Sequence, residues 1–411
     1  MKFRATILHI LRQITSPHIQ TFNLHIPFSH AKSKLFSRTL TSITNLVRIR
    51  NVATINISLD SLCYFKPVDF VPRCIFKIRS LVELKLDGYF YCKLPNVKRG
   101  VVNLPNLKKL ELVEIQLDCY QKLWALIKSC PVLEVLSLKP VFDNAANVGV
   151  VNISSPKLKS LLMINRIRTR DVKFVIDTPL LEHLVLHGYL GYYSFVEYPS
   201  KLIKAELCIN DFYVGKRYTD LSAKILQVVQ RISGVESASL DYYPSFFKVL
   251  SNMDVDLGSI FRNLTHLKLS AFGFEDFDVH NPIPLCLLSK LKRLEIMQMK
   301  GKANSVKLLK YILRDANVLE RLYLTTVYDF HGFDNYRNFF DDNDSDSKDE
   351  NDLKRDQLWW EYKIFKTLLF VPKSSLPSEV KFVGNYICVS SNGPQNGLIV
   401  TSNDRNPASQ Y

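Results

Sequence analysis

Two histidines stand four residues apart in the middle of the chain, at His183 and His187. On a helix this spacing would place both imidazoles on one side, where they could share a metal ion. The residues from His183 to His187 alternate between polar and apolar as in a strand, however. At about 3.3 Å per residue the two side chains would then lie roughly 13 Å apart. That separation is too large for one ion, so we interpret both as surface histidines of a strand and predict no metal site.

A second candidate for metal chemistry is the acidic stretch that contains Asp342, Asp344 and Asp346, whose spacing is that of the first ligands of a calcium-binding EF-hand loop. The sixth position should be glycine and is Ser347, and the twelfth should be glutamate and is Leu353. We therefore interpret the stretch as a solvated acidic segment. An acid-directed kinase could modify Ser345 or Ser347, but a plain linker is the simpler interpretation.

Motifs for nucleophilic or cofactor chemistry are missing. The sequence has no G-x-S-x-G, P-loop, G-x-G-x-x-G or H-E-x-x-H pattern. Its eight cysteines are spread singly and form no C-x-x-C pair, which argues against zinc and dithiol redox sites. We predict that the protein is no enzyme and needs no cofactor. Single cysteines in a chain of this length also favour reduced thiols and a cytoplasmic or nuclear location.

The charge balance is strongly basic, with 54 Lys and Arg against 39 Asp and Glu in 411 residues, a net charge of +15. The first acidic residue is Asp60, and such a basic start could be an organelle transit peptide. We favour a basic first part of the fold, because residues 19–26 alternate like a half-buried strand. No run approaches the roughly 20 apolar residues of a membrane-spanning helix, so we predict no membrane association.

One pattern, L-x-x-L-x-L, recurs along most of the chain. It is clear at Leu81, Leu107, Leu133, Leu158 and Leu181, weaker at Leu202 and Val235, and clear again at Leu264, Leu291 and Leu319, where each residue named is the first of its copy. The nine intervals average about 26 residues, inside the ~20–29 residue period of leucine-rich repeats. Degenerate copies begin at Ile19 and Val52.

Each L-x-L reads as a strand whose alternate side chains point into a core. One unit cannot bury its apolar side alone, so stacked units must form a parallel sheet covered by the return segments. Prolines two residues before the first leucine (Pro105, Pro131, Pro156 and Pro179) end the preceding segment. We predict an α/β fold, an irregular leucine-rich-repeat solenoid (horseshoe) with a parallel concave sheet, in which Leu136 and Leu184 are fully buried.

The return segments are uneven. Residues 118–129, 219–232 and 304–315 show the apolar periodicity of amphipathic helices. Residues 140–156 read instead as irregular or extended chain.

The residues between the core leucines should face the concave surface. We count seven basic and six acidic side chains there, without aromatic interleaving, whereas a groove for nucleic acid should carry one sign of charge. We therefore predict no nucleic-acid binding. The middle repeats place apolar side chains on this surface, and a contiguous exposed apolar patch usually marks a contact site. We predict partner-binding residues at Leu162, Ile164, His183, Val185, His187 and Lys204. The competing interpretation is that the loop 188–200 folds over this patch.

Several segments resemble the plant F-box/leucine-rich-repeat/FBD family. They are Phe70-Val-Pro-Arg-Cys-Ile-Phe, Cys130-Pro-Val-Leu-Glu-Val-Leu, Val175-Ile-Asp-Thr-Pro-Leu-Leu-Glu-His-Leu, Leu291-Lys-Arg-Leu-Glu-Ile and Tyr311-Ile-Leu-Arg-Asp-Ala-Asn-Val-Leu-Glu-Arg-Leu. The last is similar to the FBD region. The resemblance covers most of residues 15–330.

The resemblance implies a protein-binding scaffold that recognises substrates for a cullin-based ubiquitin ligase. Family members dock through an N-terminal F-box to a Skp-type adaptor, and this sequence shows no F-box pattern, since Trp124 is its first tryptophan. We expect the adaptor and cullin as partners only if an F-box lies upstream. The alternative is an F-box-less regulatory or decoy binder with no ligase role.

These patterns predict five regions. They are an N-terminal cap without an F-box (1–50), leucine-rich repeats (51–330, with 283–330 FBD-like), an acidic disordered insertion (331–358), a C-terminal capping strand region (359–390) and a flexible tail (391–411).

Overall fold

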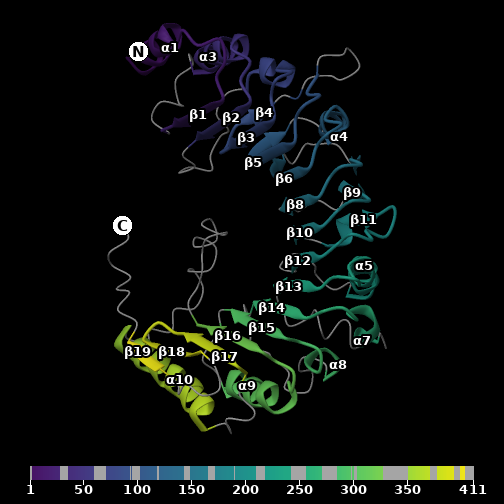
Figure 1. The fold of residues 1–411 in the computed structure, drawn as a ribbon, viewed down its shortest axis with the longest axis vertical. Coiled ribbons are helices and arrows are strands. Elements are labelled where there is room, and N and C mark those ends of the chain that lie inside the picture. The colour runs from purple at the N-terminus through teal and green to yellow at the C-terminus, as the bar shows by residue number, and fades with distance from the viewer. Residues whose placement is uncertain are drawn as a thin grey trace. The chain divides into compact units, whose positions relative to one another are not determined.

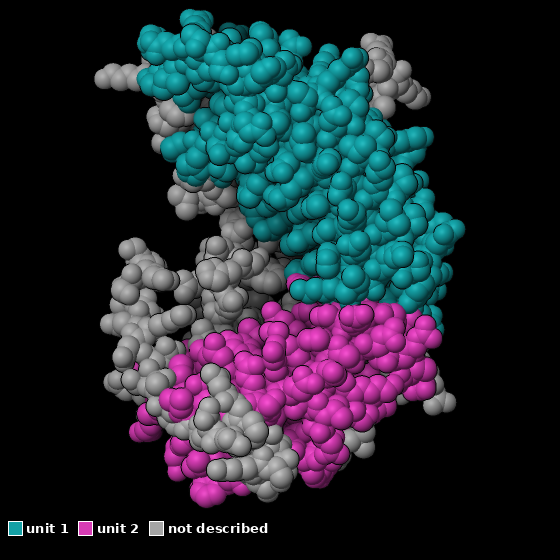
Figure 2. Space-filling view, viewed as in Figure 1, with its two compact units in different colours: residues 1–205, 210–232 teal, residues 206–209, 233–411 magenta. Residues whose placement is uncertain are grey.

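The computed structural model describes residues 2–27, 36–59, 71–92, 94, 102–117, 120–142, 149–164, 172–188, 190–209, 218–241, 256–270, 285–297, 299, 303–326, 350–370, 377–392 and 399–402. The chain divides into two compact units (Figure 2). Unit 1 comprises residues 1–205 and 210–232, and unit 2 comprises residues 206–209 and 233–411. The boundary between the two units falls within strand β12 (Lys204–Ile209), after Ala205.

Unit 1 is built on parallel strands that each contain one L-x-L copy. Seven strands pair in chain order along this sheet: β1 (Thr21–Ile26), β2 (Thr54–Leu59), β3 (Glu83–Asp87), β5 (Lys109–Leu117), β6 (Val135–Phe142), β8 (Ser160–Ile164) and β10 (His183–Gly188). The short β4 (Tyr91–Cys92) pairs with the end of β5. The predicted strand in residues 19–26 and the parallel sheet are confirmed.

The return segments of unit 1 form an outer layer (Figure 1). Its helical segments are α1 (Lys2–Gln13), α3 (Phe36–Ile49), η1 (Arg73–Lys77), α4 (Tyr120–Lys128), η3 (Leu190–Tyr192) and α5 (Tyr218–Arg231). A second parallel sheet belongs to this layer, with the strand order β7 (Gly149–Ser154), β9 (Val172–Asp177) and β11 (Tyr193–Phe195). Helix α4 packs against β7, and α5 packs against β11.

The core of unit 1 lies between the sheet and this layer. The leucines of the L-x-L copies are buried there, and the predicted burial of Leu136 and Leu184 is confirmed at 0% and 1% exposure. Alternate residues of the same strands are half-buried or exposed, as the pattern of β3 shows at Glu83, Lys85 and Asp87. Removing these leucines from water supplies the main free energy of folding, so the repeat is the unit of stability.

The prolines stand at a defined place in each repeat. In four repeats the first leucine donates its backbone N–H to the carbonyl three residues before it, closing a turn with proline in its second position: Leu107 to Leu104, Leu133 to Cys130, Leu158 to Ser155 and Leu181 to Thr178. Proline favours that position because its ring fixes φ near −65°. The turn then delivers the chain to the next strand.

Unit 2 also contains parallel strands, and these are followed by antiparallel strands at its C-terminal end. The strands β13 (Ser237–Asp241), β14 (His266–Ser270), β15 (Arg293–Met297), β16 (Arg321–Thr325) and β17 (Glu379–Val383) pair in parallel. The last two strands, β18 (Ile387–Asn392) and β19 (Ile399–Ser402), pair antiparallel. The described helices of this unit are α7 (Leu257–Ile260), α8 (Leu285–Leu288), α9 (Ala303–Asp315) and α10 (Glu350–Phe370).

The helices expected in residues 118–129, 219–232 and 304–315 are confirmed by α4, α5 and α9. Two expectations near the C-terminus are wrong in part. Residues 331–358 were expected to be a disordered insertion, but α10 begins at Glu350 and continues through the first part of the expected strand region. Residues 391–411 were expected to be a flexible tail, yet β19 pairs with β18 within them. The acidic residues from Asp341 to Asp349 lie outside the described residues.

Candidate functional site

The side of the unit 1 sheet that faces away from the core presents the first, third and fifth residues of each strand. We call this surface the open face. The strand register aligns these residues in rows, and the middle row runs Asn23, Asn56, Lys85, Glu111, Ser137, Leu162 and Val185. Neighbouring residues in such a row are close enough to interact across strands.

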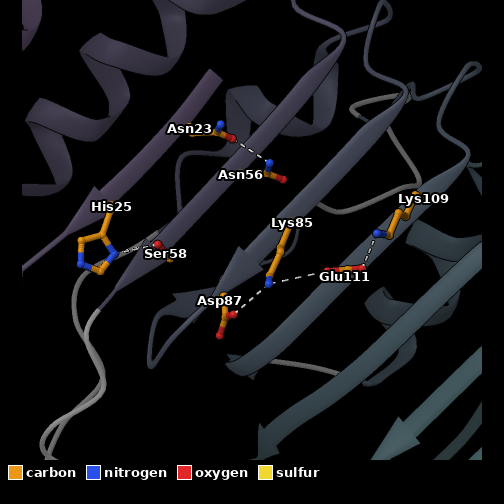
Figure 3. A network of polar contacts seen from close by, with 8 residues as sticks. All are labelled: Asn23, His25, Asn56, Ser58, Lys85, Asp87, Lys109 and Glu111. Carbon is orange, nitrogen blue, oxygen red and sulfur yellow. Dashed lines mark hydrogen bonds and ion pairs between the residues drawn. The ribbon is translucent and has the colours of Figure 1, made fainter. Parts of the chain in front are cut away.

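At the N-terminal strands, polar side chains of the open face bind one another (Figure 3). The Asn56 side-chain N–H donates to Asn23 Oδ1 over 2.7 Å, and His25 Nδ1 lies 3.0 Å from the Ser58 hydroxyl. An asparagine or histidine that has found a neighbour has fewer groups left to offer an outside ligand.

The next two strands carry charges that compensate one another. Lys85 Nζ lies 3.2 Å from Asp87 and 3.9 Å from Glu111, and Lys109 Nζ lies 2.8 Å from Glu111. The hydrogen bond and charge of Glu111 raise the pKa of Lys109. Because cations and anions alternate here, β3 and β5 present no surface of a single sign of charge.

The character of the open face changes at β8 and β10. Leu162, Ile164 and Val185 are half-buried there, His183 is exposed, and Lys204 of β12 is exposed. The register places Val185 beside Leu162. We call Leu162, Ile164 and Val185 the apolar patch. These three residues, together with His183 and Lys204, lie on the open face, as the alternation of the strands predicts.

His187 departs from the prediction, because its side chain is only 8% exposed. It stands at the end of β10, where Gly188 has a φ of 110° and the chain turns away from the sheet. The Tyr193 hydroxyl donates to the His187 carbonyl over 3.2 Å. A side chain at this turn no longer follows the alternation of the strand, so His187 does not contribute to the surface beside the patch.

The loop expected to cover the patch is bound elsewhere. Tyr193 lies in β11, which pairs with β9 of the second sheet, and its ring stacks on Phe174 with centroids 5.5 Å apart. Burial raises the pKa of the Tyr193 hydroxyl. The described part of residues 188–200 therefore contributes to the outer layer, and the interpretation that it covers the patch loses support.

Sequence reasoning missed an ion pair beside the patch. Lys139, on the open face of β6, lies 3.1 Å from Glu114, and both side chains are largely buried. Glu114 sits in a bulge where the pairing of β5 with β6 shifts between Val113 and Gln116. A bulge is set by pairing with a distant strand, so only the missing alternation after Val113 could have signalled it.

We searched the described residues for metal-binding groups and for membrane-spanning helices and found neither. Among them, no group of three or more His, Cys, Asp and Glu side chains is arranged to hold a metal ion. No helix in the described part of the chain combines the length and the apolar character needed to cross a membrane.

Comparison with known proteins agrees with the repeat architecture. Residues 18–205 match the family model described as "FBD-associated F-box protein At5g56370, LRR repeats", and residues 280–324 match the FBD model. The first match lies within unit 1, and the second reaches from before β15 to β16.

Similar curated proteins come from Arabidopsis thaliana. F-box/LRR-repeat protein 13 is 26% identical over 62% of this chain and 62% of its own length. FBD-associated F-box protein At4g10400 is 25% identical over 73% of each. The putative FBD-associated F-box protein At5g44940 is 29% identical over 64% of this chain and 60% of its own length. The chain thus spans less than two thirds of the first and third of these relatives. Its repeats and its FBD segment make it a relative of the plant F-box/FBD/LRR-repeat proteins.

Proposed function

We propose that the protein is a non-enzymatic scaffold that binds a protein partner through the open face of unit 1. The observation that carries the proposal is the apolar patch at β8 and β10, on a surface whose N-terminal strands β1–β3 are polar and form hydrogen bonds and ion pairs with their neighbours. Leu162, Ile164 and Val185 retain exposed area on the side of the sheet that faces away from the core. Protein interfaces typically combine such an apolar centre with a polar rim.

The rim of the patch favours a partner of defined character. His183 and Lys204 are exposed, while Ser137 and Ser160 are small neighbours that leave the leucine accessible. Lys139 is already paired with Glu114. A partner segment with apolar side chains and an acidic flank would match this arrangement, because Lys204 supplies a positive charge at the edge.

The family resemblance adds a biological role. The relatives named above are F-box proteins by name. We propose that the open face recognises a substrate as part of an F-box-type ubiquitin ligase receptor. The alternative from the sequence is a regulatory or decoy binder without ligase activity. The two roles predict opposite effects on the partner, since a receptor lowers its abundance and a decoy raises it. We also propose that the protein acts in the cytoplasm or nucleus.

Photo-crosslinking tests the binding face. A photoreactive amino acid at position 162 of the full chain should give a discrete crosslinked partner in plant cells. The same photoreactive amino acid in place of Val150, an exposed valine of β7 in the second sheet, should give no such crosslink. With the photoreactive amino acid moved to position 164, Leu162→Asp combined with Val185→Asp should abolish the crosslinked species and leave the thermal midpoint nearly unchanged, whereas Val150→Asp should preserve the crosslinked species.

Two outcomes would overturn this assignment. A double variant that unfolds would show that Leu162 and Val185 belong to the core. Equal crosslinking from positions 162 and 150 would show that the open face is not a selective surface. Changing the amount of the full chain and following the crosslinked partner's abundance then separates the receptor from the decoy.

A further inference from the structure

Helix α10 in unit 2 has apolar residues on two sides. Its inner side includes Ile364 and Leu368, both fully buried, and the helix packs against α9 and β18 (Figure 1). Its outer side exposes five large apolar residues, which we call the α10 stripe: Leu358, Trp359, Tyr362, Leu369 and Phe370. Trp359 is 54% exposed and Phe370 is 73% exposed. Isolated exposed apolar side chains are ordinary, but five on one helix form a patch.

The spacing of this outer side is that of a helix-pairing seam. Leu358, Tyr362, the half-buried Phe365 and Leu369 follow one another at intervals of four, three and four residues. This is the alternation that keeps apolar side chains along one line when two helices pack together. Trp359 and Phe370 flank the line, with the Trp359 ring stacked on Tyr362 at a centroid distance of 5.6 Å.

The charge beside the seam has one sign. Lys363 Nζ lies 5.1 Å from the centroid of Trp359 and 4.2 Å from that of Trp360, and Lys366 lies 5.9 Å from Phe370. Between Leu358 and Phe370 the single carboxylate is Glu361, which is completely buried. The exposed charge along the stripe is therefore positive.

Glu361 also fixes the direction in which the stripe faces. Its carboxylate accepts hydrogen bonds from three successive backbone N–H groups, those of Asn385, Tyr386 and Ile387, at 2.7, 2.8 and 2.9 Å. Asn385 and Tyr386 belong to the turn between β17 and β18, and Ile387 is the first residue of β18. Because a buried carboxylate held in this way cannot leave without a large loss of hydrogen bonding, α10 cannot rotate to bury the stripe.

We propose that the α10 stripe is a second docking surface, and that its partner is an amphipathic α-helix with an apolar seam and acidic flanks, supplied by another protein. The seam spacing calls for a helix, and the two lysines call for carboxylates beside it. A second copy of this chain fits less well, because it would bring the same lysines to the contact. This surface is separate from the open face of unit 1, and its test is independent.

A displayed peptide library can test the chemistry without knowing the partner. Helical peptides with a fixed apolar seam and flanks randomised among Glu, Gln and Lys are selected on the full chain. They are counter-selected on a variant that combines Trp359→Ser with Leu369→Ser. Selected flanks should be enriched in Glu over Lys, and the winning peptide should bind the double variant roughly tenfold more weakly or worse. Val318→Ser, which changes an exposed apolar residue elsewhere in unit 2, is the matched control and should bind normally.

Charge reversal gives a second readout that does not depend on the apolar variants. Lys363→Glu with Lys366→Glu should invert the selection, so that Lys flanks are preferred. Selection without charge preference would overturn the proposal, and so would equal binding to the wild type and to the folded Trp359→Ser, Leu369→Ser variant. Sedimentation showing a dimer of the wild type that this serine variant lacks would also overturn it, because a second copy would then be the occupant. Co-sedimentation of the wild type, but not the double variant, with phosphatidylserine vesicles would reassign the stripe to a lipid surface.

Discussion

At the scale of single residues, Glu114 combines backbone strain with a partly buried charge. Its φ of 56° lies in the left-handed region, where side chains other than glycine are disfavoured. Two residues after the last strand leucine of other repeats, glycine also has a positive φ, of 122° at Gly88 and 110° at Gly188. At Gly88 an added Cβ would lie 2.7 Å from the Leu59 carbonyl oxygen, so the chain has no room there. In this conformation the Glu114 carboxylate pairs with Lys139.

Two substitutions separate these effects. Glu114→Ala and Glu114→Gly both remove the ion pair, but only glycine relieves the strain. We expect the glycine variant to be more stable than the alanine variant by about 1 kcal/mol. Chemical denaturation measures the difference in unfolding free energy, provided that this free energy depends equally on denaturant concentration in the two variants. Equal stability, or a more stable alanine variant, would show that the backbone at position 114 is not strained.

The cysteines differ in their environments. Cys130 is fully buried, its thiol donates to the Leu126 carbonyl, and burial raises its pKa from about 9 to about 12. Below pH 9 the thiol is protonated in both the folded and unfolded states. Above that, the unfolded chain loses the proton first, so the stability linked to Cys130 falls as pH rises towards 12.

We therefore expect the unfolding free energy of the wild type to fall between about pH 9 and 11 more steeply than that of Cys130→Ala. The difference in slope is at most about 1.4 kcal/mol per pH unit. Denaturant titrations at several pH values provide the measurement. Iodoacetamide should also modify the exposed Cys286 well before Cys130. Parallel pH slopes for the two proteins would contradict the assignment.

At the scale of elements, the pattern predicted those whose period repeats and missed those that depend on distant contacts. The L-x-L strands and helices α4, α5 and α9 were predicted because each has one apolar side. Helix α10 was partly assigned to disorder, because its apolar residues lie on two sides and its first turn is acidic. The β7, β9 and β11 sheet was not predicted, since its short strands sit in return segments of uneven length.

The same contrast applies to the open face. Alternation placed Leu162, Ile164 and Val185 correctly, because they lie inside strands. It failed for His187, which stands where the strand ends, and for the Lys139–Glu114 pair, which needs the bulge in β5. Positions at strand ends are decided by the turn that follows, and that turn depends on neighbouring repeats.

The contact between α10 and the β17–β18 turn depends on a close fit. Besides the three backbone N–H groups, the Glu361 carboxylate accepts hydrogen bonds from the Thr326 hydroxyl at 3.1 Å and from Gln357 Nε2 at 2.8 Å. A Cβ at Gly384 would overlap the Glu361 carboxylate. The same Cβ would lie 2.8 Å from the Ile387 carbonyl oxygen, so the glycine is required by two close neighbours and not by its own φ.

A double-mutant cycle tests this dependence. Glu361→Gln should destabilise the protein by about 3 kcal/mol, because one acceptor becomes an amide donor that faces backbone donors. Glu379→Gln, the same change in an exposed pair with Arg321, should cost less than about 1 kcal/mol. Gly384→Ala should be destabilising alone and less so in the Glu361→Ala background, where the carboxylate is gone but the close Ile387 carbonyl oxygen remains. Additive effects would show that the two residues do not compete for the same space.

At the scale of the whole molecule, the two surfaces that we propose for partners differ in charge. The described cations of the open face on β3 and β5 are paired with carboxylates, whereas the α10 stripe is positive and apolar. The surplus of +15 therefore does not gather on the N-terminal strands of the open face. Salt should weaken binding at the α10 stripe more than at the apolar patch of unit 1, because only the stripe couples its apolar line to two lysines.

The described N-terminal elements also allow a test of adaptor binding by residues 1–411. Helix α1 packs on α3, and β1, which begins at Thr21, already pairs with β2, so the described N-terminal elements are part of the repeat fold. We expect the purified chain not to form a one-to-one complex with a plant Skp-type adaptor in size-exclusion chromatography. Fusing the F-box of a relative ahead of Met1 is the matched control and should produce that complex, because docking in this family uses the F-box. A stoichiometric complex with the unfused chain would mean that its own elements include an adaptor-binding surface, and the decoy role would then lose its basis.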